Sequence, residues 1–165
     1  MAMSGADIWT AIDSYLASGV SEFNAYSGTL ALLSTATGVV RKVATLGDEP
    51  GAMSWEVAIA PNGSTAYVLA TTSSPRESTV IPVDLATGTA GKTIDVGRNA
   101  SMLTISANGA TVFVLDSGTY VGVGSPHNTP GRVIPIATST GTAGKAITVG
   151  LAPAAFAITP TSQKR

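Results

Sequence analysis

The chain contains no cysteine, a single histidine and few charged residues. Without cysteine it forms no disulfide, offers no thiolate to a metal and has no cysteine nucleophile. One histidine is too few for a haem or copper centre, or for a hydrolytic zinc site, each of which needs several such ligands. Charged residues make up 12% of the chain and the formal net charge is −1, which argues against nucleic acid as a partner.

Long apolar runs are also missing, so we expect no membrane-spanning segment. Residues 1–7 have neither the basic region nor the apolar stretch of an export signal, so no signal peptide is predicted. Apolar residues nevertheless make up 44% of the 165 residues, which is enough for one globular domain with a substantial core. Threonine, serine, alanine, glycine and valine are abundant, as is typical of many short strands joined by tight turns.

The most informative feature is an internal repeat. Residues 80–97 recur as residues 133–150, with twelve of eighteen positions identical, including Val-Ile-Pro and Thr-Gly-Thr-Ala-Gly-Lys. A Thr-Gly pair at residues 37–38, 87–88 and 140–141 extends the repeat to three units, spaced by 50 and 53 residues. Such a period indicates one copied supersecondary unit that buries its apolar face against its neighbours.

Each unit is predicted to hold four antiparallel strands, which in the middle copy cover about 56–60, 65–71, 79–85 and 92–96. Asn-Gly at 62–63 and 108–109 predicts hairpin turns, because both residues tolerate positive φ. Pro82 and Pro135 lie inside predicted third strands, where a ladder donor is lost. Either a bulge lies there or the proline nitrogen faces an unpaired gap.

The N-terminal region allows two interpretations. Ser4 and Asp7 resemble a helix capping box, and apolar residues between 8 and 16 have helical spacing. A shift of 103 residues, the sum of the two periods, instead places residues 11–14 on 114–117 without a gap. We favour the second interpretation, a strand–loop–strand, since a helix has no reason to follow the repeat.

The fold prediction is therefore an all-β single domain over 1–165, with repeats at about 4–60, 61–107 and 108–162. Each unit begins with the second strand of one blade and ends with the first strand of the next. We expect the last strand, 154–159, to pair with the three N-terminal strands and to complete a mixed blade.

Units of this length with four strands and an Asn-Gly turn resemble the blades of β-propellers. Residues 60–68, 80–88 and 94–97 are similar to the YVTN-repeat family of bacterial propellers, within the WD40-like and quinoprotein-dehydrogenase-like group. The resemblance covers about 150 residues, but Tyr67-Val68 is followed by Leu69-Ala70 instead of the family's namesake residues. The family is often exported or associated with the cell envelope, so the resemblance implies export of the parent protein; the sequence leaves the compartment unknown.

Three blades are too few to close a ring, since propellers use about four to eight. Two arrangements follow from this count. Either further blades exist in a longer parent chain, or a homodimer completes a six-bladed ring.

The resemblance to propellers also implies where a ligand binds. Loops that join second to third strands, and fourth to next first strands, emerge on one face of a propeller, and the length differences between copies fall on these loops. Insertions gathered on one face often mark the binding side of a repeat protein. The candidate ligand-binding residues in these loops are Glu22, Asn24, Asp48, Glu49, Arg76, Glu77, Arg98, His127 and Asn128.

The leading functional hypothesis is a non-catalytic propeller scaffold that presents this face to a protein, a glycan or a small ligand. No cofactor and no catalytic residue are predicted, because no nucleophile, base and acid occur at recognisable spacing. The alternative is a lactonase-type hydrolase with Ca²⁺ or Mg²⁺ held by Glu22, Asp48, Glu49 and Glu77. A third possibility is a propeller fragment without independent function. Three aspartates near strand ends are expected to satisfy turn amides: Asp84, Asp95 and Asp116.

Overall fold

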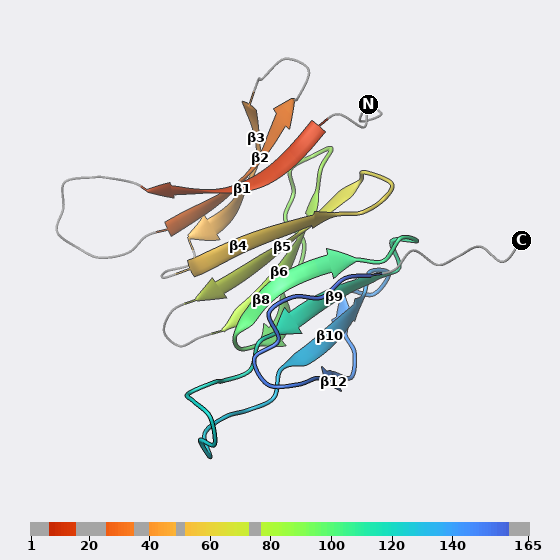
Figure 1. Cartoon of the computed structure of the whole chain (residues 1–165). Coiled ribbons are helices and arrows are strands. Elements are labelled where there is room, and N and C mark those ends of the chain that lie inside the picture. Colours follow the sequence, from red (N-terminus) through yellow and green to blue (C-terminus); the bar gives the residue numbers. More distant parts are fainter. Residues whose placement is uncertain (1–6, 16–25, 35–39, 49–51, 73–76, 159–165) are drawn as a thin grey trace, which may run out of the picture.

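The computed structural model describes residues 7–15, 26–34, 40–48, 52–72 and 77–158. These residues form twelve strands in three antiparallel sheets, which follow one another as an arc (Figure 1). None of the described residues belongs to a helix able to cross a membrane. The all-β prediction is confirmed.

The boundaries of the predicted repeats, after residues 60 and 107, fall behind the first strand of the second sheet and of the third sheet. The first sheet has the order β1 (Asp7–Tyr15), β2 (Tyr26–Ser34), β3 (Val40–Asp48). The second has the order β4 (Ala52–Ile59), β5 (Thr65–Thr72), β6 (Ser78–Asp84), β7 (Ile94–Gly97). In the third, β8 (Ala100–Ile105), β9 (Thr111–Asp116) and β10 (Arg132–Ala137) are followed by β11 (Thr142–Ala143) and β12 (Ile147–Thr148), which both pair with β10.

The N-terminal region is a strand, as the repeat predicted. β1 pairs antiparallel with β2 from Asp7 opposite Ser34 to Tyr15 opposite Tyr26. The helical interpretation of this region is wrong, because the hydrogen-bonding needs of the copied unit prevail over local helical spacing.

The predicted pairing of 154–159 with the first sheet does not occur within the described residues of the chain. Residues 153–158 belong to no strand, and the described part of the first sheet contains β1, β2 and β3 alone. The physical reason lies just upstream, where the Val149 amide donates to the Gly131 carbonyl and the Gly131 amide donates to the Gly150 carbonyl. These bonds hold the C-terminal segment against the third sheet, at the other end of the arc from β1 (Figure 1). Residue 159 lies outside the described residues.

The core consists of two apolar layers, one on each side of the second sheet. Alternation along β5 sends Ala66 and Val68 toward the first sheet and Tyr67 and Leu69 toward the third. The layer shared with the first sheet contains Leu30, Ala44, Leu46, Ile81, Val83 and Leu85. The layer shared with the third sheet contains Val80, Ile94, Val96, Ala100, Leu103, Val112, Val114, Ile134 and Ile136.

Tyr67 is the largest side chain in the second layer and is 7% exposed. Burial raises the pKa of its phenol, and a hydrogen bond with Thr138 of the third sheet acts in the opposite direction. Tyr67 therefore combines apolar packing with a polar contact between neighbouring sheets.

Neither strand proline lies at a bulge, because Pro82 pairs with Tyr67 and Pro135 with Phe113 without a register shift. The Pro82 carbonyl accepts from the Gly91 amide at 2.7 Å, and the Pro135 carbonyl accepts from the Gly144 amide at 2.7 Å. The nitrogen and carbonyl of a residue in an antiparallel strand face the same side, so both proline nitrogens face the interrupted outer strand. A Cβ on Gly91 would lie 3.0 Å from Pro82 Cγ, which explains a glycine at this position of the repeated turn.

The Asn-Gly turns differ in detail from the prediction. Positive φ occurs at Gly63 (69°) and Gly109 (70°), whereas neither preceding asparagine adopts it. The Asn62 side chain instead accepts from the Ser64 amide at 3.1 Å. The turns are thus longer than two residues, and asparagine contributes through its side-chain oxygen.

The inner strands β1, β4 and β8 of successive sheets lie next to one another. A direct polar link joins two of them, because the Leu103 amide of β8 donates to Glu56 Oε2 of β4 at 2.8 Å. This bond satisfies a backbone donor at the inner edge of the third sheet.

Glu56→Ala should lower the free energy of unfolding by about 1 kcal/mol, because a partly buried amide loses its acceptor. Glu56→Gln retains an acceptor oxygen and should lose less. Urea unfolding of the two variants and the parent measures the difference. Equal stability of all three proteins would show that the link contributes nothing.

Asp84 Oδ1 accepts from the amides of Thr87 (2.8 Å) and Ala86 (2.9 Å) and from the Thr87 hydroxyl (3.0 Å). The bonds from Thr87, first the amide and then the hydroxyl, lower the pKa of the Asp84 carboxyl, although desolvation acts against them. A depressed pKa stabilises the folded state above the pKa of the unfolded chain, and this stabilisation disappears as pH falls through the folded value.

Asp84→Asn should therefore be less stable than the parent at pH 7. The difference in free energy of unfolding should narrow below pH about 4, where the carboxyl of the unfolded chain begins to take up its proton. Urea unfolding at pH 7 and at about pH 2.5 measures it. Lys92→Gln, an exposed change near the same turn, serves as the control. A gap of equal size at both pH values would contradict the role of the charge.

Candidate functional site

The ends of β5, β7 and β9 and the starts of β6, β8 and β10 lie on the same side of the arc, at the left in Figure 1. We call the described residues 77–78, 97–101 and 116–132 on this side the loop face. The copies differ most in length here, so the loop face is where a candidate site is built.

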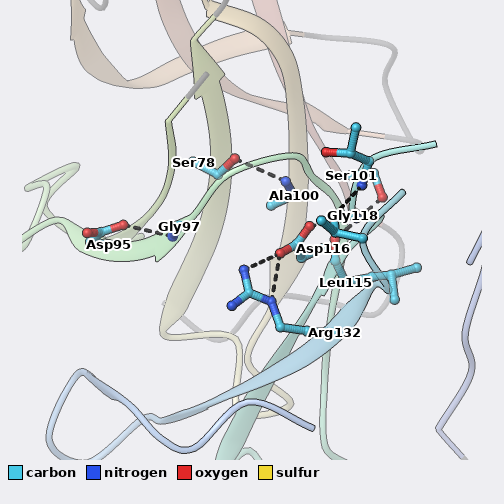
Figure 2. Close-up of polar contacts among 11 residues, drawn as sticks. Ser78, Asp95, Gly97, Ala100, Ser101, Leu115, Asp116, Gly118 and Arg132 are labelled. Atoms are coloured by element: carbon cyan, nitrogen blue, oxygen red, sulfur yellow. Dashed lines mark hydrogen bonds and ion pairs between the residues drawn. The ribbon is translucent and has the colours of Figure 1, made fainter. Parts of the chain in front are cut away.

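On the loop face one hydrogen bond joins the second sheet to the third, and another continues the β8–β9 ladder into the adjoining loops. The buried Ser78 hydroxyl accepts from the Ala100 amide at 3.1 Å (Figure 2). The Ser117 amide donates to the Asn99 carbonyl at 3.0 Å. Asn99 has a positive φ of 59°, which turns the chain from β7 into β8. The loop face is therefore a continuous, internally bonded surface across two blades.

An ion pair lies at the centre of this surface. Asp116 Oδ2 accepts from Arg132 Nη2 at 2.6 Å and from Arg132 Nε at 3.1 Å, across the register position where β9 and β10 face each other (Figure 2). Asp116 Oδ1 accepts from the Gly118 amide at 2.8 Å. The carboxylate is 2% exposed, whereas the Arg132 side chain is 46% exposed, so part of the guanidinium is accessible to a ligand.

The structural role predicted for the three aspartates is confirmed. Asp95 Oδ1 accepts from the Gly97 amide at 2.8 Å, as Asp84 and Asp116 accept from their own turns. Arg132 was missed by the sequence analysis. Its position directly after the long loop, opposite an aspartate in the register, is the signal that could have identified it.

The loop between β9 and β10 is closed at its base. Thr119 and Thr129 exchange backbone bonds, with the Thr129 amide 2.9 Å from the Thr119 carbonyl. The Asn128 side chain accepts from the Val121 amide at 2.8 Å and donates to the Gly122 carbonyl at 2.7 Å. Gly118 has a φ of 68°, and a Cβ there would lie 2.8 Å from the Pro130 carbonyl carbon.

This closed loop carries exposed apolar side chains. Tyr120, Val121 and Val123 are 52%, 65% and 98% exposed, and the loop projects away from the sheets (Figure 1). Apolar side chains normally avoid such exposure when they can pack. These three residues are not among the candidates predicted from the sequence, which are all charged or polar.

The candidate residues from the sequence fall into three groups. Glu77, Arg98 and His127 are exposed on the loop face, whereas Asn128 serves the loop's own hydrogen bonding. Asp48 is the last residue of β3 and pairs with Ser27. The remaining four lie outside the described residues: Glu22, Asn24, Glu49 and Arg76.

Metal ligands do not gather in the part of the chain that the structure describes, where no three Asp, Glu or His residues come together. An open depression at the opposite end of the second sheet includes Asp84, whose Oδ1 is already engaged by its own turn. The loop face offers chemistry of a different kind, with an accessible guanidinium, exposed Arg98 and a rigid apolar protrusion.

No family model matches the chain, and no curated protein matches it. Three solved structures are similar to it. The β-propeller domain of the Trilobed protease from Pyrococcus furiosus, described as having an open velcro topology, aligns with a TM-score of 0.56 and 12% identity over 89% of this chain and 40% of that one. Hydrazine synthase from Kuenenia stuttgartiensis aligns with a TM-score of 0.54 and 23% identity over 76% of this chain and 31% of that one. TolB from Acinetobacter baumannii aligns with a TM-score of 0.51 and 12% identity over 87% of this chain and 30% of that one.

These structural matches establish the fold. The three antiparallel sheets are blades of a partial β-propeller. The chain spans 40% or less of the length of these three structures. The structural matches support β-propellers in general and do not distinguish the YVTN-repeat family from other propellers.

Arg132→Ala should lower the free energy of unfolding by about 2 kcal/mol, because the buried Asp116 carboxylate loses its cation, and partial exposure of the arginine keeps the loss below that of a fully buried pair. Adding Asp116→Asn should recover part of the loss, since a neutral amide still accepts from Gly118. Urea unfolding measures both variants.

Arg98→Ala is the matched control, an exposed arginine on the same face whose loss should change stability by less than about 0.5 kcal/mol. If Arg132→Ala behaves like Arg98→Ala, the ion pair does not stabilise the loop face.

Proposed function

We propose that this partial propeller is a non-catalytic scaffold whose loop face binds a protein partner. The observation that carries the proposal is the β9–β10 loop, in which exposed Tyr120, Val121 and Val123 stand on a closed, hydrogen-bonded base. The proposal assigns no cofactor and no catalytic residue to the chain.

Exposure of these apolar groups favours a protein as the partner. Burying a valine side chain in a partner's surface gains about 1.5 kcal/mol or more, and tyrosine is enriched at protein interfaces. A sugar would call for stacked aromatic rings and several free polar groups, and the described part of this loop offers one tyrosine.

The rigid base of the loop strengthens the argument. Ordering flexible side chains and loops on binding costs free energy, so a loop that is already fixed binds more tightly for the same contacts. The Asn128 side chain and the Thr119–Thr129 pair fix the backbone on either side of Val123.

Charge adds a rim to this apolar centre. Arg98 is exposed, and the partly exposed Arg132 guanidinium lies so close to Gly97 that a Cβ there would be 3.6 Å from Nη2. Both arginines suit acidic groups at the edge of an interface, where charges influence association rate and specificity.

The proposal includes membership of the YVTN-repeat family, supported by residues 60–68, 80–88 and 94–97, and export of the parent protein, which rests on that resemblance. A longer parent chain with further blades and a homodimer that completes the ring are both compatible with the short coverage of the similar structures.

Peptides selected against the immobilised chain from a random display library provide the test. Val121→Ser/Val123→Ser should weaken their binding at least about tenfold, or about 1.4 kcal/mol, with an unchanged melting temperature. Fluorescence anisotropy of labelled peptides measures the dissociation constants. Ile147→Ser, which alters a 56% exposed apolar residue on β12, should leave binding unchanged.

Two results would overturn the proposal. Peptides that bind equally to the parent and the double-serine variant would place binding away from the loop. A rise in melting temperature with millimolar Ca²⁺, together with hydrolysis of lactone substrates, would favour the metal-dependent hydrolase.

A further inference from the structure

β1 forms the inner edge of the first sheet and has one strand partner among the described residues. In the described part of the chain β1 pairs with β2 alone. Its counterpart in the third sheet, β9, pairs with β8 on one side and β10 on the other. Every position of β1 that corresponds to β9 therefore lacks the partner that β8 provides. A nine-residue edge strand is a ready template for another strand.

The C-terminal segment is the counterpart of β8. Residues 150–158 follow residues 97–105 by the same 53 positions that relate the two copies of the repeat. The backbone agrees with this correspondence, because Ala152 has a positive φ of 47° where Asn99 has 59°. Positive φ costs alanine about 1–2 kcal/mol, so this kink marks a defined change of direction into the next blade.

A donor strand and an acceptor edge thus exist in one chain but do not meet within it. The Gly131–Gly150 and Val149–Gly131 hydrogen bonds hold the start of the C-terminal donor strand at the third sheet. β1 lies at the opposite end of the arc (Figure 1). Residues 153–158 form no strand in this arrangement.

We propose that residues 153–158 of one copy pair antiparallel with β1 of a second copy. Reciprocal exchange between two copies satisfies both free edges at once and closes two three-bladed arcs into a six-bladed ring, within the range of known propellers. The inference is independent of what the loop face binds.

The repeat also specifies the register of this pairing. β8 and β9 pair with Leu103 opposite Val114 and Ile105 opposite Val112. Adding 53 to the residue numbers of β8 gives the C-terminal segment, and subtracting 103 from those of β9 gives β1. This places Phe156 opposite Ala11 and Ile158 opposite Trp9. Phe156, now partly buried, would take the position that Leu103 occupies in the core between blades.

The structure identifies the pair best suited to a disulfide probe. The Leu103 amide donates to Glu56, away from β9, so Leu103 and Val114 form a non-hydrogen-bonded pair. Side chains of such pairs lie closest together, at distances compatible with a disulfide. Phe156 and Ala11 are the equivalent pair, and the chain has no cysteine of its own to interfere.

Equal amounts of Ala11→Cys and Phe156→Cys, unfolded together and refolded under mild oxidation, should give a disulfide-linked heterodimer on a non-reducing gel. Thr10→Cys mixed with Phe156→Cys is the matched control and should cross-link at least about tenfold less, because a one-residue slip turns the side chain to the other face. Equal cross-linking of both mixtures would overturn the proposed register.

Light scattering on the parent chain gives a second measure that needs no cysteine. We expect twice the monomer mass. Ala157→Pro should shift the protein to monomer, because proline removes a backbone amide that, by its position in the repeat, faces the partner strand. Two outcomes would overturn the proposal. One is a parent that stays monomeric at micromolar concentration, and the other is a disulfide that forms within a single chain of the Ala11→Cys/Phe156→Cys double variant.

Discussion

The structure depends on the burial of both faces of each β-sheet. An apolar blade has two sides, and a sheet with residues such as Ala66 and Tyr67 at consecutive positions needs a neighbour on each of them. The second sheet has both neighbours, and its β5 strand is buried almost completely from Ala66 to Ala70. Hydrogen bonds close each blade internally, but apolar packing determines that blades stand in an arc.

The repeat made much of this fold predictable. Strands β5 and β6 start within one residue of the positions expected, because alternation and turn residues recur in each copy. The strand at Asp7–Tyr15 followed from the same period despite its helical spacing. The C-terminal pairing failed as a prediction for a different reason, since complementary edges specify which strands suit each other and not whether the chain between them lets them meet.

The candidate site was predictable in position and only partly in chemistry. Turn geometry required an acceptor at Asp116, and the sequence shows this directly. The partner of that carboxylate, Arg132, depends on the register of β9 and β10 across a long loop. Asn128 was predicted as a ligand-binding residue, yet the oxygen and the nitrogen of its side-chain amide both form hydrogen bonds within the loop. Valines at a loop tip become informative only once their exposure is known.

The interrupted outer strands have a consequence for how copies of this chain can assemble. In the second and third blades the fourth strand is short or interrupted beside Pro82 or Pro135, and a short, interrupted edge is a poor template for another chain. The outer edges of these two blades therefore resist lateral sheet growth. In the proposed dimer, strand addition instead uses β1 at the inner edge, where two copies exchange strands in a closed ring and growth stops at a finite assembly.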